Sequence, residues 1–189
     1  MNTLQAIENR KSVRSYLDQP IEQEKIKTIA RAGMMAAGTP MAGRVYLNVI
    51  SNKELLRKIS AGTKERMRKS QNPKLMKIAE NDAYDPLYHA PVAIVVSVDI
   101  DDHPEIMSMA IQNAACAAQN MLIAATDLGL GSCYLMTPTM AFDILSIHDE
   151  AKLPILGAQA IAVVVFGYTD DTQPHKAYPD DPEDIEYVE

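Results

Sequence analysis

A basic run near the amino terminus is the segment best suited to bind an anion. Arg10 and Arg14 lie four positions apart, with Lys11 and Ser12 between them. Guanidinium forks, a hydroxyl and nearby backbone N–H groups are the donors that a phosphate group needs. The run also follows a short helical pattern, so the same cations could instead sit at a helix C-terminus, where they favour the helix dipole. The residues alone leave both interpretations open.

Other patterns that support catalysis are weak in this sequence. Gly129-Leu130-Gly131 offers two glycines of a dinucleotide fingerprint, but it follows a helical pattern and Tyr134 stands where the third glycine belongs. The four histidines lack the spacing of metal ligands, and no Cys/His pair supports a nucleophile. Asp99, Asp101 and Asp102 are interpreted as a solvated strand end. We therefore expect no catalytic side chain, and a bound cofactor that supplies the chemistry.

The composition is typical of a globular protein, and we assign residues 1–189 to one domain. The chain is 47% hydrophobic and 23% charged, with a net charge of −7 that argues against nucleic acid as a partner. Six of the 25 acids lie in an acidic tail, 180–189, so the rest has 19 acids and 18 bases. Cys116 and Cys133 form no disulfide framework or zinc pattern, and Cys133 is expected to be a small buried residue. Without a signal segment or a membrane-length apolar run, we expect no membrane association and a cytoplasmic location.

Hydrophobic periodicity and turn residues divide the chain into helices and strands without a regular βαβ rhythm, which favours an α+β fold. A capping-box pattern at Ser51–Glu54 starts the helix before a charged stretch, Leu55–Tyr88, interpreted as surface helices with a mobile connection. The other predicted helices are Thr3–Arg10, Ile21–Ala37, Ile106–Leu128 and Thr139–Ile147. The predicted strands are Val45–Ser51, Pro91–Val98, Gly129–Met136 (a glycine turn and a short strand) and Ala158–Phe166.

The predicted helix Ile106–Leu128 is apolar almost all round and rich in alanine. A helix without a wet face belongs in the centre of a structure, and in a chain of this size it is also suited to a subunit interface. A helix buried in the core of one subunit explains the same pattern equally well.

Four segments, in order along the chain, resemble motifs of the FMN-dependent nitroreductase family. Arg10–Tyr16 resembles its Arg-Arg-Ser-x-Arg-x-Phe motif, and His89–Val96 is similar to its Gly-Ala-Pro strand. Ala114–Tyr134 is similar to its long interface helix and the following turn, and Val163–Tyr168 to its last core strand. The resemblance covers nearly the whole chain.

The resemblance implies an α+β homodimer with a mixed central sheet flanked by helices, a long buried helix at the dimer interface, and FMN between the subunits. Arg10 and Ser12 would bind the phosphate or ribityl chain, and Arg14 the pyrimidine edge of the flavin. Backbone N–H groups around Met136 would face flavin N5, and residues 38–40 would come from the partner subunit. The residues assigned to FMN are Arg10, Lys11, Ser12, Arg14, Gly38, Thr39, Pro40, Met41, Met136, Thr137 and Lys176.

The activity implied is hydride transfer from NADH or NADPH through FMN to a small acceptor such as a nitroaromatic or a quinone. Met41 stands where the family has asparagine, and the family's nearby tryptophan is missing, which leaves the substrate and the electron donor open. An alternative is an FMN-binding carrier or electron-transfer protein without NAD(P)H-dependent reductase activity. A third is a dimer without flavin, whose basic run caps a helix. Relatives that dehalogenate substrates or fragment flavin mark further acceptors within the enzyme class.

Overall fold

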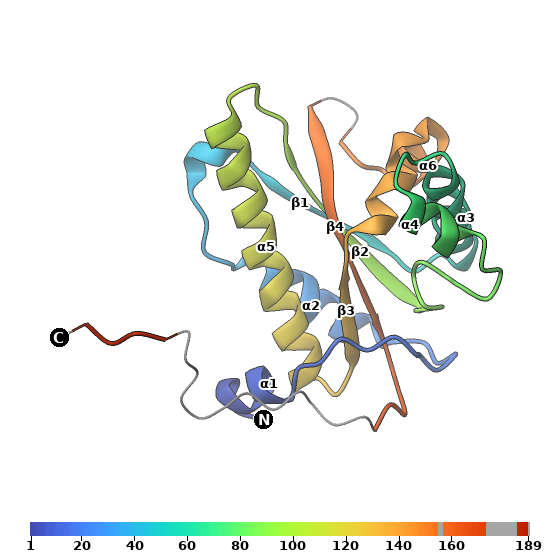
Figure 1. Ribbon diagram of the computed structural model, residues 1–189. Helices are drawn as coiled ribbons and strands as arrows, with labels where there is room; N and C mark the ends of the chain where they lie inside the picture. Colours follow the sequence, from blue (N-terminus) through green and yellow to red (C-terminus); the bar gives the residue numbers. More distant parts are fainter. Residues whose placement is uncertain (155–156, 173–184, 189) are drawn as a thin grey trace.

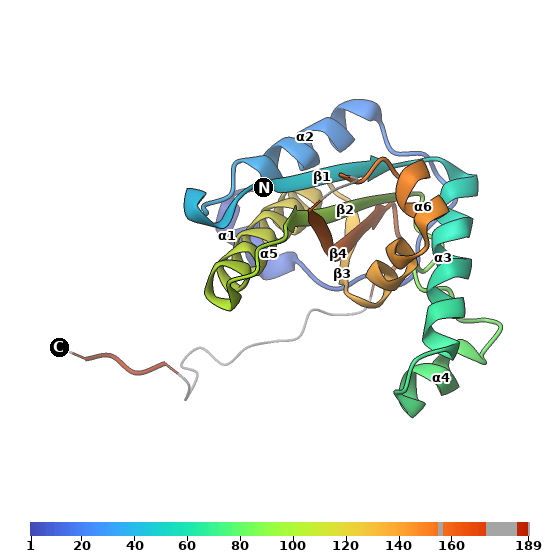
Figure 2. The ribbon, with the colours of Figure 1, turned by 90° about the horizontal axis from the view of Figure 1, so that it is seen from above.

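A four-stranded sheet separates two helical layers in the computed structural model, which describes residues 1–154, 157–172 and 185–188 (Figures 1 and 2). The strands are β1 (Val45–Ile50), β2 (Val92–Asp99), β3 (Gly131–Leu135) and β4 (Ala158–Gly167), in the order β1-β2-β4-β3. The α+β prediction is therefore confirmed. Within the described ranges, however, neighbouring strands all pair antiparallel, so the expectation of a mixed sheet is wrong for this chain. Outside these strands, the described residues contain one parallel bridge, between Ser12 and Ser132. It is isolated because the amino-terminal segment pairs with β3 at a single position.

The central strand β2 is buried on both faces. Its side chains alternate, with Ile94 and Val96 in one hydrophobic cluster and Ala93 and Val95 in the other. A strand covered by helices on both sides loses the apolar/polar alternation of a half-exposed strand. This explains the continuous apolar run from which the strand was predicted.

The first helical layer contains α1 (Thr3–Asn9), α2 (Gln23–Met34) and α5 (Pro104–Asp127). Small residues bring α5 close to its neighbours: a Cβ added at Gly33 of α2 would lie 2.8 Å from Met121 Cγ. The opposite face of α5 is exposed in this chain and carries Ile111, Ala115 and Cys116. The helix thus has an accessible face, on which these apolar residues lie beside the exposed Ser108, Gln112 and Gln119.

The second layer contains α3 (Lys53–Arg68), α4 (Pro73–Ala79), the 3-10 helix η2 (Thr137–Asp143) and α6 (Leu145–Glu150). The single helix predicted over Thr139–Ile147 is wrong, because Ile144 is extended and directs its side chain onto the core. The predicted start of α3 is also corrected. Asn52, and not Ser51, is the N-cap, since its side-chain oxygen accepts from Glu54 N and Leu55 N.

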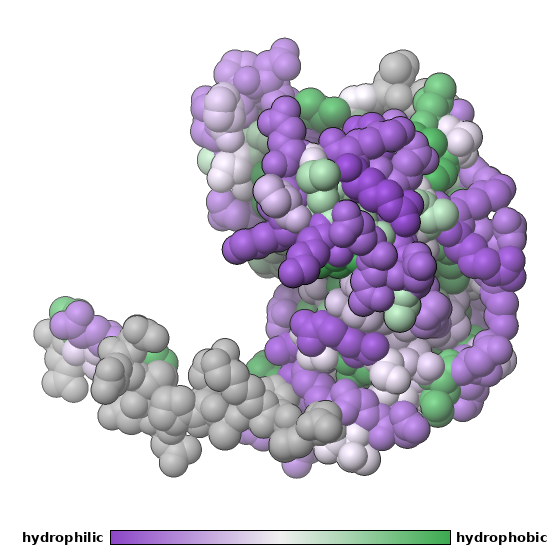
Figure 3. Space-filling view, turned by 45° about the vertical axis from the view of Figure 1, so that its right-hand side comes forward, coloured by the Kyte–Doolittle hydropathy of each residue, from purple (hydrophilic) through white to green (hydrophobic). Residues whose placement is uncertain are grey.

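The outer surfaces of the two helical layers differ. The face that carries α3 and α4 is mostly hydrophilic (Figure 3), as expected for the charged stretch before Tyr88. Beyond the first layer, a short 3-10 helix, η1 (Pro40–Ala42), connects α2 to β1. In the described part of the chain, none of the helices has the length and apolar character needed to cross a bilayer. The predicted acidic tail lies outside the described residues, apart from 185–188.

Candidate functional site

The basic run follows the edge strand β3. Val13 N donates a hydrogen bond of 2.9 Å to Ser132 O, and the Tyr16 hydroxyl donates one of 2.8 Å back to Val13 O. Gly131 permits this approach, because a Cβ there would lie 2.9 Å from Val13 Cγ1. The Tyr16 ring lies against Gly167, where a Cβ would be 2.7 Å from Tyr16 Cδ1. The conformation of the run is thus fixed by contacts with two strands.

The four polar residues of the run occupy different environments. Arg10 is the C-cap residue of α1, as the helix-capping hypothesis predicts. Lys11 is half-buried, and its Nζ donates to Asp171 O at 2.8 Å, which ties the run to the segment after β4. Ser12 and Arg14 are exposed, and Arg14 Nη1 lies 3.4 Å from Ser12 O. Capping therefore describes Arg10, while Ser12 and Arg14 remain accessible to an anion.

Two buried side chains of β3 lie under this run. Cys133 is buried, as predicted, and this burial raises the pKa of its thiol, although Arg14, Ser12 and Arg10 act in the opposite direction. The thiol therefore stays protonated near neutral pH, which argues against a reactive thiolate. The Ser132 hydroxyl is also buried, and it has no hydrogen-bond partner among the described residues.

Met136 and Thr137 lie at the other end of β3. Ser132 and Met136 are four positions apart on an extended strand, so they are separated by roughly 13 Å. The Met136 side chain is exposed, and Thr137 begins η2. The edge of β3 thus connects the anion-binding donors at one end to a soft apolar side chain at the other, an arrangement suited to an elongated ligand.

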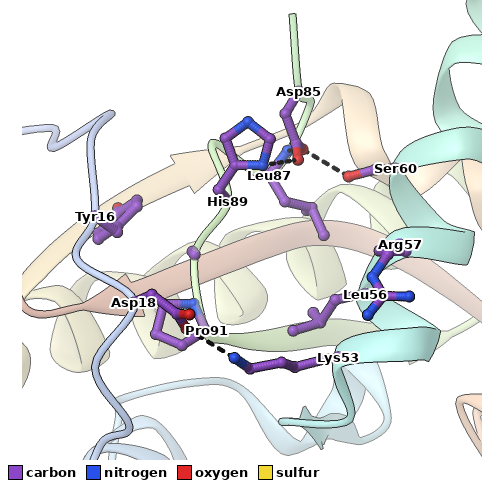
Figure 4. Close-up of a pocket in the computed structure, with 11 residues that line it drawn as sticks. Tyr16, Asp18, Lys53, Leu56, Arg57, Ser60, Asp85, Leu87, His89 and Pro91 are labelled. Carbon is purple, nitrogen blue, oxygen red and sulfur yellow. Dashed lines mark hydrogen bonds and ion pairs between the residues drawn. The ribbon is translucent and has the colours of Figure 1, made fainter.

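A cavity of about 360 Å³ continues from Arg14, between the 14–16 segment and residues 81–89. A second cavity of about 340 Å³ lies between the 16–18 segment and α3 (Figure 4). Tyr16, Asp85 and His89 line both cavities. Burial raises the pKa of the Tyr16 hydroxyl, with the Cys133 thiol adding to this effect and Arg14 opposing it, so this wall stays uncharged at Tyr16.

The turn at residues 85–89 was not predicted from the sequence. Tyr88 and His89 both have positive φ angles, 54° and 58°, a conformation that costs a side-chain-bearing residue roughly 1–2 kcal/mol. The available signal was that His89 stands at the glycine position of the Gly-Ala-Pro motif. A residue other than glycine there indicates a side chain retained in a strained backbone.

The 38–41 turn lies between α2 and β1. Asn113 of α5 holds it with two hydrogen bonds, accepting from Thr39 N at 3.0 Å and donating to Thr39 O at 2.9 Å. Gly38 is packed closely, since a Cβ there would lie 2.9 Å from Asn113. Pro40 and Met41 are exposed. The turn is therefore ordered by α5 and presents an apolar surface.

Asp99 is not the solvated strand end that the sequence suggested. It accepts hydrogen bonds from Arg44 N at 2.7 Å and from the Tyr46 hydroxyl at 2.8 Å. Gly43, with φ 71°, packs directly against it. The Asp99 side chain is short, so its carboxylate lies close to the backbone where β1 begins and bonds to Arg44 N and Tyr46 there. These contacts explain why Asp99 is half-buried.

The structure does not bring the two groups of predicted site residues together in one chain. Asp127, at the end of α5, accepts from the amino group of Met1 at 2.7 Å, and the basic run follows α1 from there. Asn113, which holds the 38–41 turn, is 14 positions earlier, a distance of roughly 21 Å along the helix axis. Lys176 lies outside the described residues. Among the described residues, no cluster of His, Cys, Asp and Glu is arranged to hold a metal ion.

Comparison with known proteins provides independent information. A model of the nitroreductase family matches residues 7–168. A putative NADH dehydrogenase/NAD(P)H nitroreductase from Methanothermobacter thermautotrophicus is 30% identical over 135 residues, which cover 71% of this chain and 60% of that protein. An FMN reductase (NADPH) from Bacillus subtilis is 30% identical over 139 residues, covering 71% and 53%. The match thus spans little more than half the length of these curated relatives.

Solved structures are similar over the full chain. A nitroreductase with bound FMN from Bacteroides fragilis superposes with a TM-score of 0.87 at 25% identity, and the match covers 100% of both chains.

Proposed function

The chain belongs to the nitroreductase family, and on that premise we propose that it is an FMN-dependent oxidoreductase. It takes hydride from NADH or NADPH and delivers it to a small acceptor such as a nitroaromatic or a quinone. The observation that carries the proposal is the exposed pair Ser12 and Arg14, held in a fixed conformation along β3. The FMN bound to the similar Bacteroides fragilis structure supports it.

The side chains along β3 fit the chemical groups of FMN. A phosphate or a polyol needs donors, and Ser12, Arg14 and the unpartnered Ser132 hydroxyl supply hydroxyl and guanidinium groups. Under this proposal Arg10 and Ser12 hold the phosphate or ribityl chain, with Lys11 fixing the run and Arg14 at the pyrimidine edge. Lys176 is the proposed further phosphate ligand, and it lies outside the described residues.

The protein contributes position and charge to the reaction. FMN, when bound, supplies the hydride chemistry. The guanidinium of Arg14 offers positive charge where the reduced ring system becomes negative, which favours reduction. Backbone N–H groups at Met136 and Thr137 complete the proposed ring contacts. The exposed Met136 side chain provides an apolar surface for a planar ligand.

The functional unit that we propose is a homodimer. In one chain the 38–41 turn is remote from the basic run, so a partner subunit has to supply Gly38, Thr39, Pro40 and Met41 to the site. Three methionines near this turn are largely exposed, Met34 at 61%, Met35 at 74% and Met41 at 71%. Together with the exposed Ile111, Ala115 and Cys116 of α5 they form a surface typical of a protein interface. The cytoplasmic location stays a prediction.

A second candidate is an FMN carrier or electron-transfer protein without NAD(P)H-dependent activity. The observation in its favour is Met41, which stands where the family has asparagine and is exposed on the turn. The visible spectrum of the purified protein, recorded without oxygen before and after addition of NADH or NADPH, separates the two. A yellow protein that bleaches supports the oxidoreductase. A yellow protein that does not bleach supports the carrier, and a protein that takes up no FMN contradicts both.

A further inference from the structure

The turn at residues 85–89 forms the wall between the two cavities described above. Its His89 side chain borders the cavity beside Arg14 and also the cavity against α3 (Figure 4). The imidazole therefore lies next to the segment that we propose to hold the flavin ring. Neither the family motif nor the proposed function assigns a role to this side chain.

Three hydrogen bonds fix the carboxylate that holds His89. Asp85 Oδ1 accepts from Ser60 Oγ at 2.6 Å and from Leu87 N at 2.7 Å, and Asp85 Oδ2 lies 2.8 Å from His89 Nδ1. The Asp85 side chain is only 18% exposed, whereas the His89 side chain is 79% exposed. A carboxylate on Nδ1 accepts the Nδ1 proton and sets the orientation of the imidazole, so that Nε2 points outward and carries a proton only in the imidazolium form.

The backbone of the turn opposes a histidine at this position. At φ 58° a glycine would be free of strain, and glycine is what the family motif has here. The neighbouring Tyr88 has the same left-handed conformation. The chain thus retains an anchored imidazole where the local conformation favours a residue without a side chain.

The charged groups around His89 come from two other elements. From the amino-terminal segment, Arg14, Tyr16 and Asp18 line the same cavities. From α3, Lys53 and Arg57 face it, and Lys53 Nζ pairs with Asp18 at 2.8 Å. Asp18 carries the only carboxylate among these five residues, and this carboxylate forms an ion pair with Lys53.

The turn itself adds Tyr84 and Tyr88, whose rings meet edge to face. Leu56, Leu87 and Pro91 supply apolar lining below the imidazole. A planar ligand with oxygen acceptors suits this wall, because the apolar groups contact its ring and Nε2 of the imidazolium can donate to its oxygen.

We propose that His89 is the acid that protonates the acceptor, an inference that rests on the proposed function. A quinone, NAD(P)H and one proton give a hydroquinone and NAD(P)⁺. The two electrons leave the nicotinamide as hydride, and the quinone is reduced. The Nε2–H bond of the imidazolium breaks while an O–H bond forms on the quinone oxygen. The neutral imidazole then takes up a proton from water.

The first test compares two acceptors with the FMN-loaded protein and two variants, His89→Gly and His89→Asn. Both replacements suit a left-handed backbone, and Asn keeps a polar side chain that can still contact Asp85. NADH oxidation by 1,4-benzoquinone should slow by about a hundredfold in both variants, the typical contribution of a positioned acid. Oxidation by ferricyanide, which accepts one electron and no proton, should not change.

The second test does not depend on turnover. Benzoate, an aromatic carboxylate that these conditions do not reduce, serves as a binding probe, and NMR signals of the histidine rings report its binding. Benzoate should bind the wild-type protein about tenfold more tightly than either variant, because the variants lack the imidazole donor.

The proposal is overturned if benzoquinone turnover is unchanged in both variants, or if benzoate binds none of the three proteins. It is also overturned if the variants bind benzoate as tightly as the wild type. If the wild type oxidises NADH with neither acceptor, the proposed function fails, and the proposal, which rests on it, fails with it. Benzoate binding that depends on His89 would then identify an anion site of another kind.

Discussion

The basic run and the 38–41 turn lie at opposite ends of α5, and they are held in different ways. The run is fixed within its own chain by Val13, Tyr16 and Lys11, and it presents the polar groups of Ser12 and Arg14. The turn is held by the amide of Asn113 and presents Met41. A polar half-site can form before a ligand arrives, whereas an exposed apolar turn is stabilised only when something covers it. In the proposed dimer, each chain would therefore contribute a polar half to one site and an apolar half to the other.

The largest effect is expected from a charge on the exposed face of α5. Ala115→Arg would place a guanidinium inside the proposed dimer interface, where an unpaired charge costs about 3–5 kcal/mol. The dimer dissociation constant should rise more than about a hundredfold, and flavin should be lost with it. Analytical ultracentrifugation with absorbance at the flavin wavelength measures both. Ala61→Arg, on the exposed side of α3, is the control. A monomeric variant that keeps all its flavin would contradict the proposal that both subunits contribute to each FMN site.

The next effect concerns the polar half alone. Arg14→Ala removes an exposed guanidinium from the run, and the FMN dissociation constant should rise roughly ten- to a hundredfold, as expected for a hydrogen bond to a charged group. Flavin fluorescence quenching measures the affinity. Arg66→Ala, which removes an exposed ion pair with Asp143, should leave it unchanged. Equal affinities for both variants would mean that the run only caps α1.

The anchor of the apolar half is tested by Asn113→Ala. This change removes the partner of Thr39 N and one of the two donors to Thr39 O, and the free energy of unfolding should fall by about 1–2 kcal/mol. Urea denaturation followed by circular dichroism gives the value. Gln71→Ala, at an exposed position between α3 and α4, should be nearly neutral. If the two variants were equally stable, the turn would not depend on α5.

The smallest effect at neutral pH is expected for Tyr16→Phe, which removes the hydrogen bond to Val13 O and should cost about 1 kcal/mol. Burial raises the pKa of Tyr16, so the folded protein keeps a proton that the unfolded chain loses near pH 10. This contribution to stability is complete below that pH and is lost as the pH rises above it. The free energy of unfolding should therefore fall less steeply with alkaline pH in Tyr16→Phe than in the wild type. The exposed Tyr187→Phe control should follow the wild type.

Much of the fold could be predicted because local pattern and tertiary environment agree. Strand β2 was visible as an apolar run because helices cover both of its faces, and α5 as a long alanine-rich helix because it packs closely on α2 and the sheet. Ile144 shows where local pattern is insufficient. Its extended backbone divides a helical pattern because the core beside it accepts the side chain in that conformation.

The candidate site was predictable only where one segment carries it. The donors of the basic run are consecutive, so the sequence reveals them. The anchored His89 depends on Asp85 in the same turn and on Ser60 in α3, a contact between positions 25 residues apart. The positive φ at His89 results from that packing. The distance between the two half-sites likewise depends on how the helices pack.

The length of α5 has a consequence for how sequences of this kind can diverge. One residue inserted between Asn113 and Asp127 would lengthen the helix by about 1.5 Å and rotate one end against the other by about 100°. Either the 38–41 turn would then lose its hydrogen bonds to Asn113, or the start of α1 would lose the contact between Met1 and Asp127. An insertion of seven residues would restore nearly the same face but move the ends about 10 Å further apart. Insertions and deletions should therefore be tolerated in the surface loops of this protein and excluded from this helix.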